Sequence, residues 1–156
     1  MNIHEIVESQ RRFFRTGATL PVSFRREMLR RLLDAVNRRE AEIGAALAAD
    51  LGKSGYESFM CETGLVRGEI SWMLRHVGRL ARERTVATPL AQFAARSFQR
   101  PSPYGSALIM SPWNYPVLLT LDPLADAIAA GNTAVVKPSA YASATIWAMT
   151  ALVAGE

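Results

Sequence analysis

The first half of the chain has the spacing of apolar residues that is typical of amphipathic helices. Large apolar side chains recur three or four positions apart as far as about residue 83. This spacing places them on one face of a helix. We therefore predict helices over residues 3–15, about 23–50 and about 57–83. Segments 16–19 and 51–58 both contain glycine and are expected to interrupt them.

The pattern changes after residue 84. Residues 84–105 contain threonines and prolines, and smaller and larger side chains alternate from Phe93 to Gln99, which predicts a strand or two with exposed turns. Short apolar runs then follow at "SALIMS" (106–111) and "TAVVK" (133–137). Between them we predict a helix that opens at Pro116 and ends at Gly131-Asn132. A last helix is expected over about 141–154.

The order strand, helix, strand, helix within about fifty residues predicts a βαβ unit with parallel strands. Neither strand alternates with polar residues, as expected where helices cover both faces of a sheet. The fold class is therefore α/β: N-terminal helices followed by the first βαβ unit of a Rossmann-like parallel sheet. A chain of 156 residues suits a single domain.

The distribution of charged residues bears on whether the chain binds nucleic acid or spans a membrane. The net charge is +4, and all but one of the 18 Lys and Arg residues lie within residues 1–100. They are interleaved with acidic residues, which favours solvated helix faces over a nucleic-acid surface, so no nucleic-acid partner is expected. The uncharged stretches 101–121 and 138–155 contain either four prolines or mostly small residues. We therefore expect no membrane span.

The single cysteine, Cys61, has no partner for an internal disulfide, which favours a reducing, cytoplasmic location. The N-terminus lacks the pattern of a secretory signal. Cys61 is interpreted as a buried or half-buried helical residue, and the adjacent Glu62 would disfavour its thiolate. His4 and His76 are isolated in the sequence, so no metal site is expected.

Two polar residues follow the ends of the two predicted strands. Asn114 lies just after the first, and Lys137, the only basic residue in 101–156, closes the second. Ligands of open α/β sheets bind beyond the carboxyl ends of the strands. Prolines on both sides of Asn114 could hold its amide as a fixed donor for a developing oxyanion. On pattern alone, an Asn that caps the helix near Pro116 is the favoured alternative, and Lys137 has an alternative as an exposed charge.

The motifs "IMSPWNYP" (109–116) and "AIAAGNTAVVKPS" (127–139) closely resemble the aldehyde dehydrogenase superfamily, particularly its class-3-like branch. "AADLGKSGYES" (48–58) resembles the same branch, and the resemblance covers about residues 5–155. It is a resemblance to the N-terminal portion only. It implies three parts: residues 1–86 as the helical part of the cofactor-binding domain, 87–104 as a β-arm of the oligomerisation region, and 105–156 as the first βαβα of the NAD(P)-binding domain.

The resemblance also implies roles for individual residues. Asn114 matches the asparagine whose side-chain amide helps to form the oxyanion hole, and Lys137 matches the lysine that holds the adenosine ribose, with Ser139 beside it. The segment that lines the nicotinamide side of the cofactor is matched by Met110, Ser111, Pro112 and Trp113. Positions lining the aldehyde tunnel are matched by Tyr115 and Leu119.

The implied cofactor is NAD or NADP. Many relatives have a glutamate where this chain has Ala140. A carboxylate there would bond the ribose hydroxyls and repel a 2′-phosphate. Its absence leads to the hypothesis that NADP is tolerated or preferred. A KM for NAD at or below that for NADP would count against this hypothesis.

The family mechanism needs a nucleophilic cysteine and a general-base glutamate, and both lie downstream of the KPS block in relatives. We therefore expect the catalytic domain to be absent, and the 156-residue chain to be inactive alone and poorly soluble. The leading interpretation is an N-terminal fragment of an NAD(P)-dependent aldehyde dehydrogenase, which in its intact form oxidises a small-molecule aldehyde to a carboxylic acid as a homodimer or homotetramer. The alternatives are a non-catalytic nucleotide-binding or assembly module and, far less favoured, an Arg-rich nucleic-acid binder.

Overall fold

The computed structural model describes residues 2–154 of the chain. The helices are α1 (Ile3–Arg15), α2 (Val22–Arg38), α3 (Glu40–Leu51), α4 (Gly55–Ser58), α5 (Gly64–Leu80), α6 (Leu118–Ala130) and α7 (Ser143–Ala154). A π-helical turn η1 (Phe59–Thr63) joins α4 to α5, and a 3-10 turn η2 (Leu90–Gln92) lies in the hairpin. The strands are β1 (Arg84–Val86), β2 (Ser97–Gln99), β3 (Ser106–Met110) and β4 (Thr133–Lys137). Residues 1, 155 and 156, which end two of the expected parts, lie outside the described residues.

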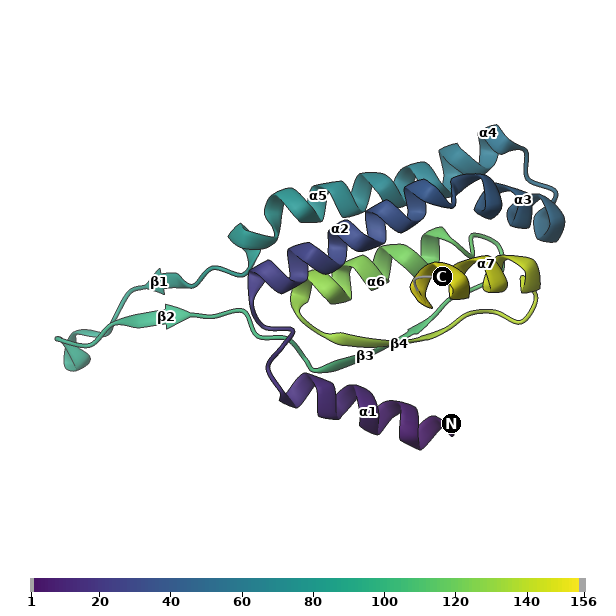
Figure 1. Ribbon diagram of the computed structural model, residues 1–156. Helices are drawn as coiled ribbons and strands as arrows, with labels where there is room; N and C mark the ends of the chain where they lie inside the picture. The colour runs from purple at the N-terminus through teal and green to yellow at the C-terminus, as the bar shows by residue number, and fades with distance from the viewer. Residues whose placement is uncertain (1, 155–156) are drawn as a thin grey trace.

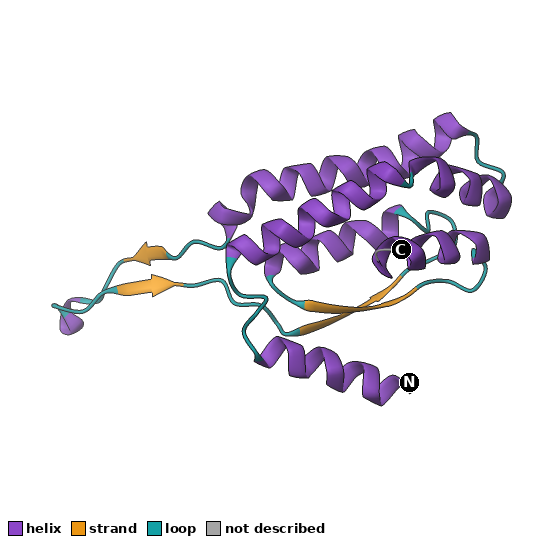
Figure 2. Cartoon of the chain, in the orientation of Figure 1, coloured by secondary structure: helices purple, strands orange, loops and turns teal. Residues whose placement is uncertain are grey.

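The βαβ unit predicted from the sequence is present. Strands β3 and β4 pair in parallel, with Ser106 opposite Thr133 and Met110 opposite Lys137. Helix α6 connects them and packs against both strands, while α1 packs against the opposite face (Figure 1). Helices α2 and α5 pack on α6 and complete a helical layer on that side (Figure 2). The predicted fold class, N-terminal helices followed by a parallel βαβ unit, is confirmed.

The core lies mainly among the helices of this layer and extends to Ile109 of the sheet. Its fully buried members come from α2, α3, α5, α6 and the residue before α6, and are Leu29, Val36, Ile43, Leu47, Val66, Ile70, Val77, Val117, Leu121 and Ala125. They recur at intervals of four or seven residues within each helix, so one face of each helix is removed from water. Burial of such side chains stabilises the fold by about 1.5–3 kcal/mol each.

The helix expected over 23–50 is two helices, α2 and α3, because the helical backbone is interrupted at Arg39. Arg39 has φ −105° and ψ 14°, and it is both the C-cap residue of α2 and the N-cap residue of α3. Its guanidinium donates to both carboxylate oxygens of Glu42, at 2.8 and 3.0 Å. Val36 and Ile43 face the core on either side of the break. The apolar spacing therefore continues through Arg39 and conceals the break.

The helix expected over 57–83 runs from Gly55 to Leu80 and contains the π-helical turn η1. Within this turn the Gly64 N–H donates to the carbonyl of Phe59, five residues earlier. A Cβ on Gly64 would lie 2.6 Å from that carbonyl oxygen, so the close approach requires glycine. The turn carries Glu62 and Thr63, which are both buried. Cys61, in the same turn, is half-buried, as the sequence predicted.

Strands β1 and β2 form an antiparallel hairpin that projects from the helical body (Figures 1 and 2). Arg84 pairs with Gln99 at its base. The alternation from Phe93 to Gln99 forms a strand only over Ser97–Gln99. Ala94 has a positive φ of 77°, which an extended strand does not permit, so the earlier residues belong to the turn.

Arg25 ties the start of α2 to the end of α6. Its guanidinium is buried and donates to the carbonyls of Thr19 at 3.0 Å, Leu20 at 2.8 Å and Ala129 at 3.2 Å. Gly131, the predicted end of α6, has φ 88°, and a Cβ there would lie 2.7 Å from the Arg25 guanidinium carbon. The helix end predicted at this glycine is confirmed, and the close approach of Arg25 gives a second reason for glycine there.

Candidate functional site

The carboxyl ends of β3 and β4 form one edge of the sheet. Met110 lies opposite Lys137, and the N–H of Ser111 donates to the carbonyl of Lys137 at 3.2 Å. Asn114 follows β3 by four residues on that same edge. The parallel pairing predicted from the sequence therefore brings the loop that carries Asn114 and the end of β4 together.

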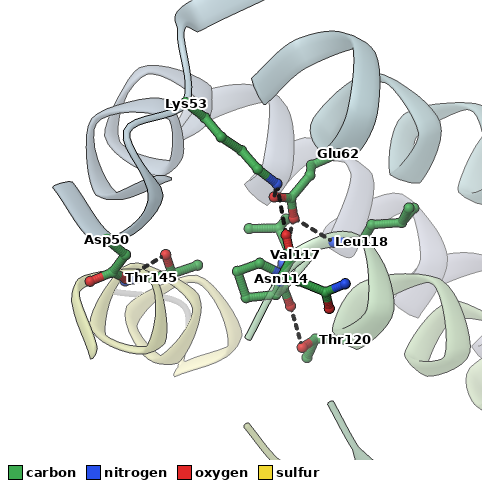
Figure 3. A network of polar contacts seen from close by, with 9 residues as sticks. Asp50, Lys53, Glu62, Asn114, Val117, Leu118, Thr120 and Thr145 are labelled. Carbon is green, nitrogen blue, oxygen red and sulfur yellow. Dashed lines mark hydrogen bonds and ion pairs between the residues drawn. The ribbon is translucent and has the colours of Figure 1, made fainter. Parts of the chain in front are cut away.

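The loop between β3 and α6 is held from inside by Thr120. The Thr120 hydroxyl donates to the carbonyl of Pro116 at 2.5 Å and lies 2.7 Å from the Ser111 hydroxyl. Both Ser111 and Thr120 are buried. These contacts connect Ser111, at the start of the loop, with Pro116, near its end, so the two ends are fixed relative to each other. Figure 3 shows Thr120 beneath the loop.

Asn114 does not cap the following helix. Helix α6 starts at Leu118, two residues after the predicted start at Pro116, and its N-cap residue makes no side-chain cap. The Glu62 Oε2 atom instead accepts from the N–H groups of Val117 at 2.7 Å and Leu118 at 3.1 Å. Among the described residues none hydrogen-bonds to the Asn114 side-chain amide, which is exposed. The capping role that the pattern favoured is wrong, and the amide is available to a ligand.

A buried ion pair supports the loop from the opposite side. Lys53 and Glu62 are 8% and 0% exposed, and their charged atoms lie 2.5 Å apart. The Lys53 ammonium also donates to the backbone carbonyl of Asn114 at 3.0 Å and lies 4.2 Å from the centre of the Tyr115 ring. Figure 3 shows the contacts of the Lys53 ammonium with Glu62 and with the Asn114 carbonyl, and the Asn114 side-chain amide extends away from Lys53.

The sequence interpretation missed this pair. It treated Lys53 as part of a helix stop and Glu62 only as a neighbour of Cys61. A signal was present, because Glu62 precedes Val66 and Ile70 by four and eight residues and so shares their buried face. A charge on such a face is rarely left without a partner.

The other predicted site residues lie at this edge with different exposures. Ser111 is buried beneath the loop, and Ser139 is half-buried, with its hydroxyl 3.4 Å from the N–H of Tyr141. The exposed members are Met110, Pro112, Trp113, Tyr115, Leu119 and Ala140. Three of these exposed residues, Pro112, Trp113 and Tyr115, lie in the same loop as the unpaired Asn114 amide.

Lys137 ends β4 with its side chain exposed. In the part of the chain that the structure describes, it forms no ion pair. Ala140, three residues later, offers no carboxylate to compete with an anion. The residues present therefore fit the ribose or phosphate groups of a nucleotide, which an exposed ammonium group binds well.

Asp50 fixes the segment that follows Lys137. Its carboxylate accepts from the N–H groups of Ala144 at 3.1 Å and Thr145 at 2.7 Å, and from the Thr145 hydroxyl at 2.8 Å. Partial burial raises the pKa of Asp50, but the hydrogen bonds from Thr145 and Ala144 outweigh it and lower the pKa overall. The carboxylate thus caps the start of α7 and holds it to the end of α3.

An acidic cluster lies between α5 and α6. Burial, followed by the charges of Glu69 and Asp126, raises the pKa of Asp122 to about 6. The pKa values of Glu69 and Asp126 are also raised, with burial as the largest cause for each. The Oδ1 atom of Asp122 is buried without a hydrogen-bond partner among the described residues. The ionised cluster therefore opposes folding.

We expect Asp122→Asn to stabilise the chain at pH above about 6. A carboxyl whose folded pKa is raised favours folding below its unfolded pKa, and this contribution is lost as pH rises to about 6. Asparagine cannot ionise, so the gain at pH 7.5, on the order of 1 kcal/mol after solvent screening, should vanish near pH 4. Chemical denaturation at several pH values measures it. Asp34→Asn, at an exposed position on α2, is the control; an equal gain from both variants would contradict the burial argument.

The described residues contain no group of His, Cys, Asp and Glu side chains arranged to hold a metal ion. None of the helices described has the length and apolar character needed to cross a membrane.

Comparison with known proteins gives a consistent assignment. A model described as "Aldehyde dehydrogenase family" matches residues 1–155. The chain is 43% identical over 133 residues to aldehyde dehydrogenase family 3 member A2 of Rattus norvegicus, and 41% identical over 127 residues to the 4,4'-diaponeurosporen-aldehyde dehydrogenase of Staphylococcus aureus. These matches cover 85% and 81% of this chain, which spans only 28% of the length of each relative. The solved substrate-bound structure of Staphylococcus aureus AldH superposes with a TM-score of 0.95 at 36% identity, over 99% of this chain and 34% of that chain.

Proposed function

We propose, from the premise that the chain belongs to the aldehyde dehydrogenase family, that it supplies the oxyanion-binding loop and part of the dinucleotide site of an enzyme that oxidises an aldehyde to a carboxylic acid. The observation that carries the proposal is the exposed Asn114 amide, which no described residue binds, on the sheet edge where β4 ends in Lys137. The chain spans about 28% of its curated relatives, so the complete reaction is part of the proposal.

In the proposed reaction, Asn114 acts on the aldehyde oxygen. A cysteine thiolate of the complete enzyme bonds to the carbonyl carbon, and the carbonyl electron pair moves onto the oxygen. The Asn114 side-chain N–H donates to that oxygen and stabilises its charge. Because the loop ends are already fixed by Thr120, little reorganisation is needed as the charge develops.

The residues around Asn114 are proposed to bind the dinucleotide and the aldehyde. When bound, NAD or NADP supplies the oxidant that takes up the hydrogen and electrons lost by the aldehyde carbon. Lys137 and Ser139 would hold the adenosine ribose. The nicotinamide side would be lined by Met110, Ser111, Pro112 and Trp113. The aldehyde tunnel would be lined by Tyr115 and Leu119, both at the exposed edge.

The side chain at position 140 supports use of NADP. Ala140 is exposed near the end of β4 and carries no charge. A 2′-phosphate would meet the Lys137 ammonium without opposition from a carboxylate at this position. We therefore propose that NADP is accepted at least as well as NAD.

The test is aldehyde-dependent formation of NADH or NADPH by the full-length gene product, measured by absorbance. We expect Lys137→Met to raise the KM for the dinucleotide by about tenfold with little change in kcat, because a charge-assisted hydrogen bond contributes roughly 1.5–3 kcal/mol. Arg38→Met, at an exposed position on α2, is the control. An unchanged KM would remove Lys137 from the site, and no aldehyde-dependent reduction of either dinucleotide would contradict the function itself.

The exposed ammonium group of Lys137 at the end of β4 also fits a second candidate, a nucleotide-binding or assembly module. This chain has one cysteine, Cys61, which is half-buried in η1, so we propose that the 156-residue chain alone does not oxidise aldehydes. Translation downstream of residue 156 distinguishes the two candidates: a continuation with a cysteine-containing active-site block favours the enzyme, and a stop codon favours the module.

We also propose that the protein is a cytoplasmic homodimer or homotetramer. Residues 87–104, which include β2 of the projecting hairpin, would contribute to its assembly.

A further inference from the structure

We propose that the buried Lys53–Glu62 ion pair positions the Asn114 amide for oxyanion binding. This inference rests on the proposed function. Both residues act through Asn114, and neither touches the substrate, so they are positioning residues.

The geometry uses both oxygens of Glu62. Oε1 contacts the Lys53 ammonium at 2.5 Å, and Oε2 accepts from the N–H groups of Val117 and Leu118. The Lys53 ammonium then donates to the carbonyl of Asn114 at 3.0 Å. The pair thus binds backbone groups on both sides of Pro116, one before it and two after it.

Packing alone does not explain such a pair. Two buried charges lose their hydration, and apolar residues of similar volume often stabilise a core as well or better. Here each charged group hydrogen-bonds to the backbone of the loop between β3 and α6, and the Lys53 ammonium also lies against the Tyr115 ring. Charge-assisted bonds of this kind fix direction as well as distance.

Glu62 lies in the π-helical turn η1. The Gly64 N–H reaches the Phe59 carbonyl across five residues, and the Glu62 carboxylate within this turn accepts from the start of α6. Such turns occur frequently at functional sites in helices. A side chain at Gly64 would collide with the Phe59 carbonyl and disrupt the turn that contains Glu62.

The consequence falls on the Asn114 amide. Lys53 holds the carbonyl of Asn114 on one side of the backbone, and the side chain extends away on the other (Figure 3). When the Asn114 carbonyl loses the Lys53 donor, the Asn114–Tyr115 peptide can rotate. The side-chain amide of Asn114 then shifts together with its backbone. Oxyanion donors lose their effect over small displacements, so the rate should fall although the amide is still present.

The decisive variant is the double substitution Lys53→Met and Glu62→Gln in the full-length gene product. Either single variant leaves a buried charge without its partner and should unfold more easily. The double variant removes both charges, and the glutamine oxygen can still accept from Val117 and Leu118. We expect its thermal midpoint to recover most of the loss, whereas kcat stays at least tenfold below wild type with the KM for the dinucleotide unchanged. Recovery of kcat along with stability would overturn the inference.

A comparison in the Asn114→Ala background separates this inference from the proposed function. If the pair acts through Asn114, the double variant should cost much less in kcat when Asn114 is already alanine. An equal loss in both backgrounds would refute positioning through Asn114, while a large effect of Asn114→Ala alone would still support the oxyanion role. Glu57→Gln, at an exposed position on α4, serves as the control for removal of a carboxylate.

Hydrogen exchange gives a readout that does not depend on activity. Mass spectrometry of the peptide spanning residues 111–118 should show faster amide exchange in the double variant than in wild type, with helix α2 unchanged. This measurement applies even if the gene product has no dehydrogenase activity, in which case the proposed function fails and the positioning of the loop is still decided. Equal exchange in the two proteins would overturn the inference.

Discussion

Replacement of Asn114 by alanine is expected to lower kcat of the full-length enzyme by about a hundredfold to a thousandfold, the usual effect of removing one oxyanion donor. The Asn114 amide is exposed and unbound by any described residue, and the loop is held through its backbone. Alanine therefore removes the donor without leaving a buried group unpaired. Steady-state rates with a saturating aldehyde and dinucleotide measure the loss.

The same substitution should leave the fold and the dinucleotide site unchanged. We expect an unaltered thermal midpoint and a KM for the dinucleotide within about twofold of wild type, because the side chain contributes no folding contact that would cost more than about 0.5 kcal/mol. Asn37→Ala, at an exposed position on α2, is a matched control. A kcat within threefold of the wild-type value, on the order of 0.6 kcal/mol in activation free energy, would exclude Asn114 as the oxyanion donor.

Arg25→Met is expected to lower the free energy of unfolding by about 3 kcal/mol. The guanidinium donates to three backbone carbonyls, two in the turn before α2 and one near the end of α6. Methionine fills most of the space of the side chain but leaves these buried acceptors without donors, and each bond from a charged donor contributes about 1.5–3 kcal/mol. The positive charge also lies at the C-terminal end of α6, where it is favoured by the helix dipole.

Urea denaturation of the 156-residue chain, or of the full-length protein if that is more soluble, measures this loss. Arg30→Met is the matched control, because Arg30 is exposed on the same helix and lies 3.9 Å from Glu27. Its effect should stay within about 0.5 kcal/mol. Similar losses for the two variants would indicate that the Arg25 hydrogen bonds contribute little beyond helix packing.

Much of this architecture follows from local patterns in the sequence. The spacing of Leu29, Val36 and Ile43 identifies helical faces, and the uninterrupted apolar runs before Asn114 and at Lys137 identify parallel strands. Gly131 ends α6 as predicted, because a positive φ is a requirement on a single residue. Each of these features depends on residues near one another in the chain.

The features that the sequence did not predict depend on contacts between distant segments. The break at Arg39 preserves the apolar spacing, so no periodicity could reveal it. Helix α6 starts after Asn114 without using it as a cap, because a carboxylate from 55 residues earlier takes that role. Glu62 of the Lys53–Glu62 pair lies in a π-helical turn, and the spacing of Glu62 from Val66 indicates its burial but not its partner nine residues earlier.

The π-helical turn η1 has a consequence for how this region can vary between homologues. Deleting one residue within Phe59–Thr63 would restore regular α-helical winding and rotate the preceding residues by about 100° relative to α5. Lys53 and α4 would then be displaced relative to Glu62, which lies just before α5, even with both side chains of the pair retained. At the positions of this turn other than Glu62, substitutions should therefore be tolerated in evolution more readily than changes in its length.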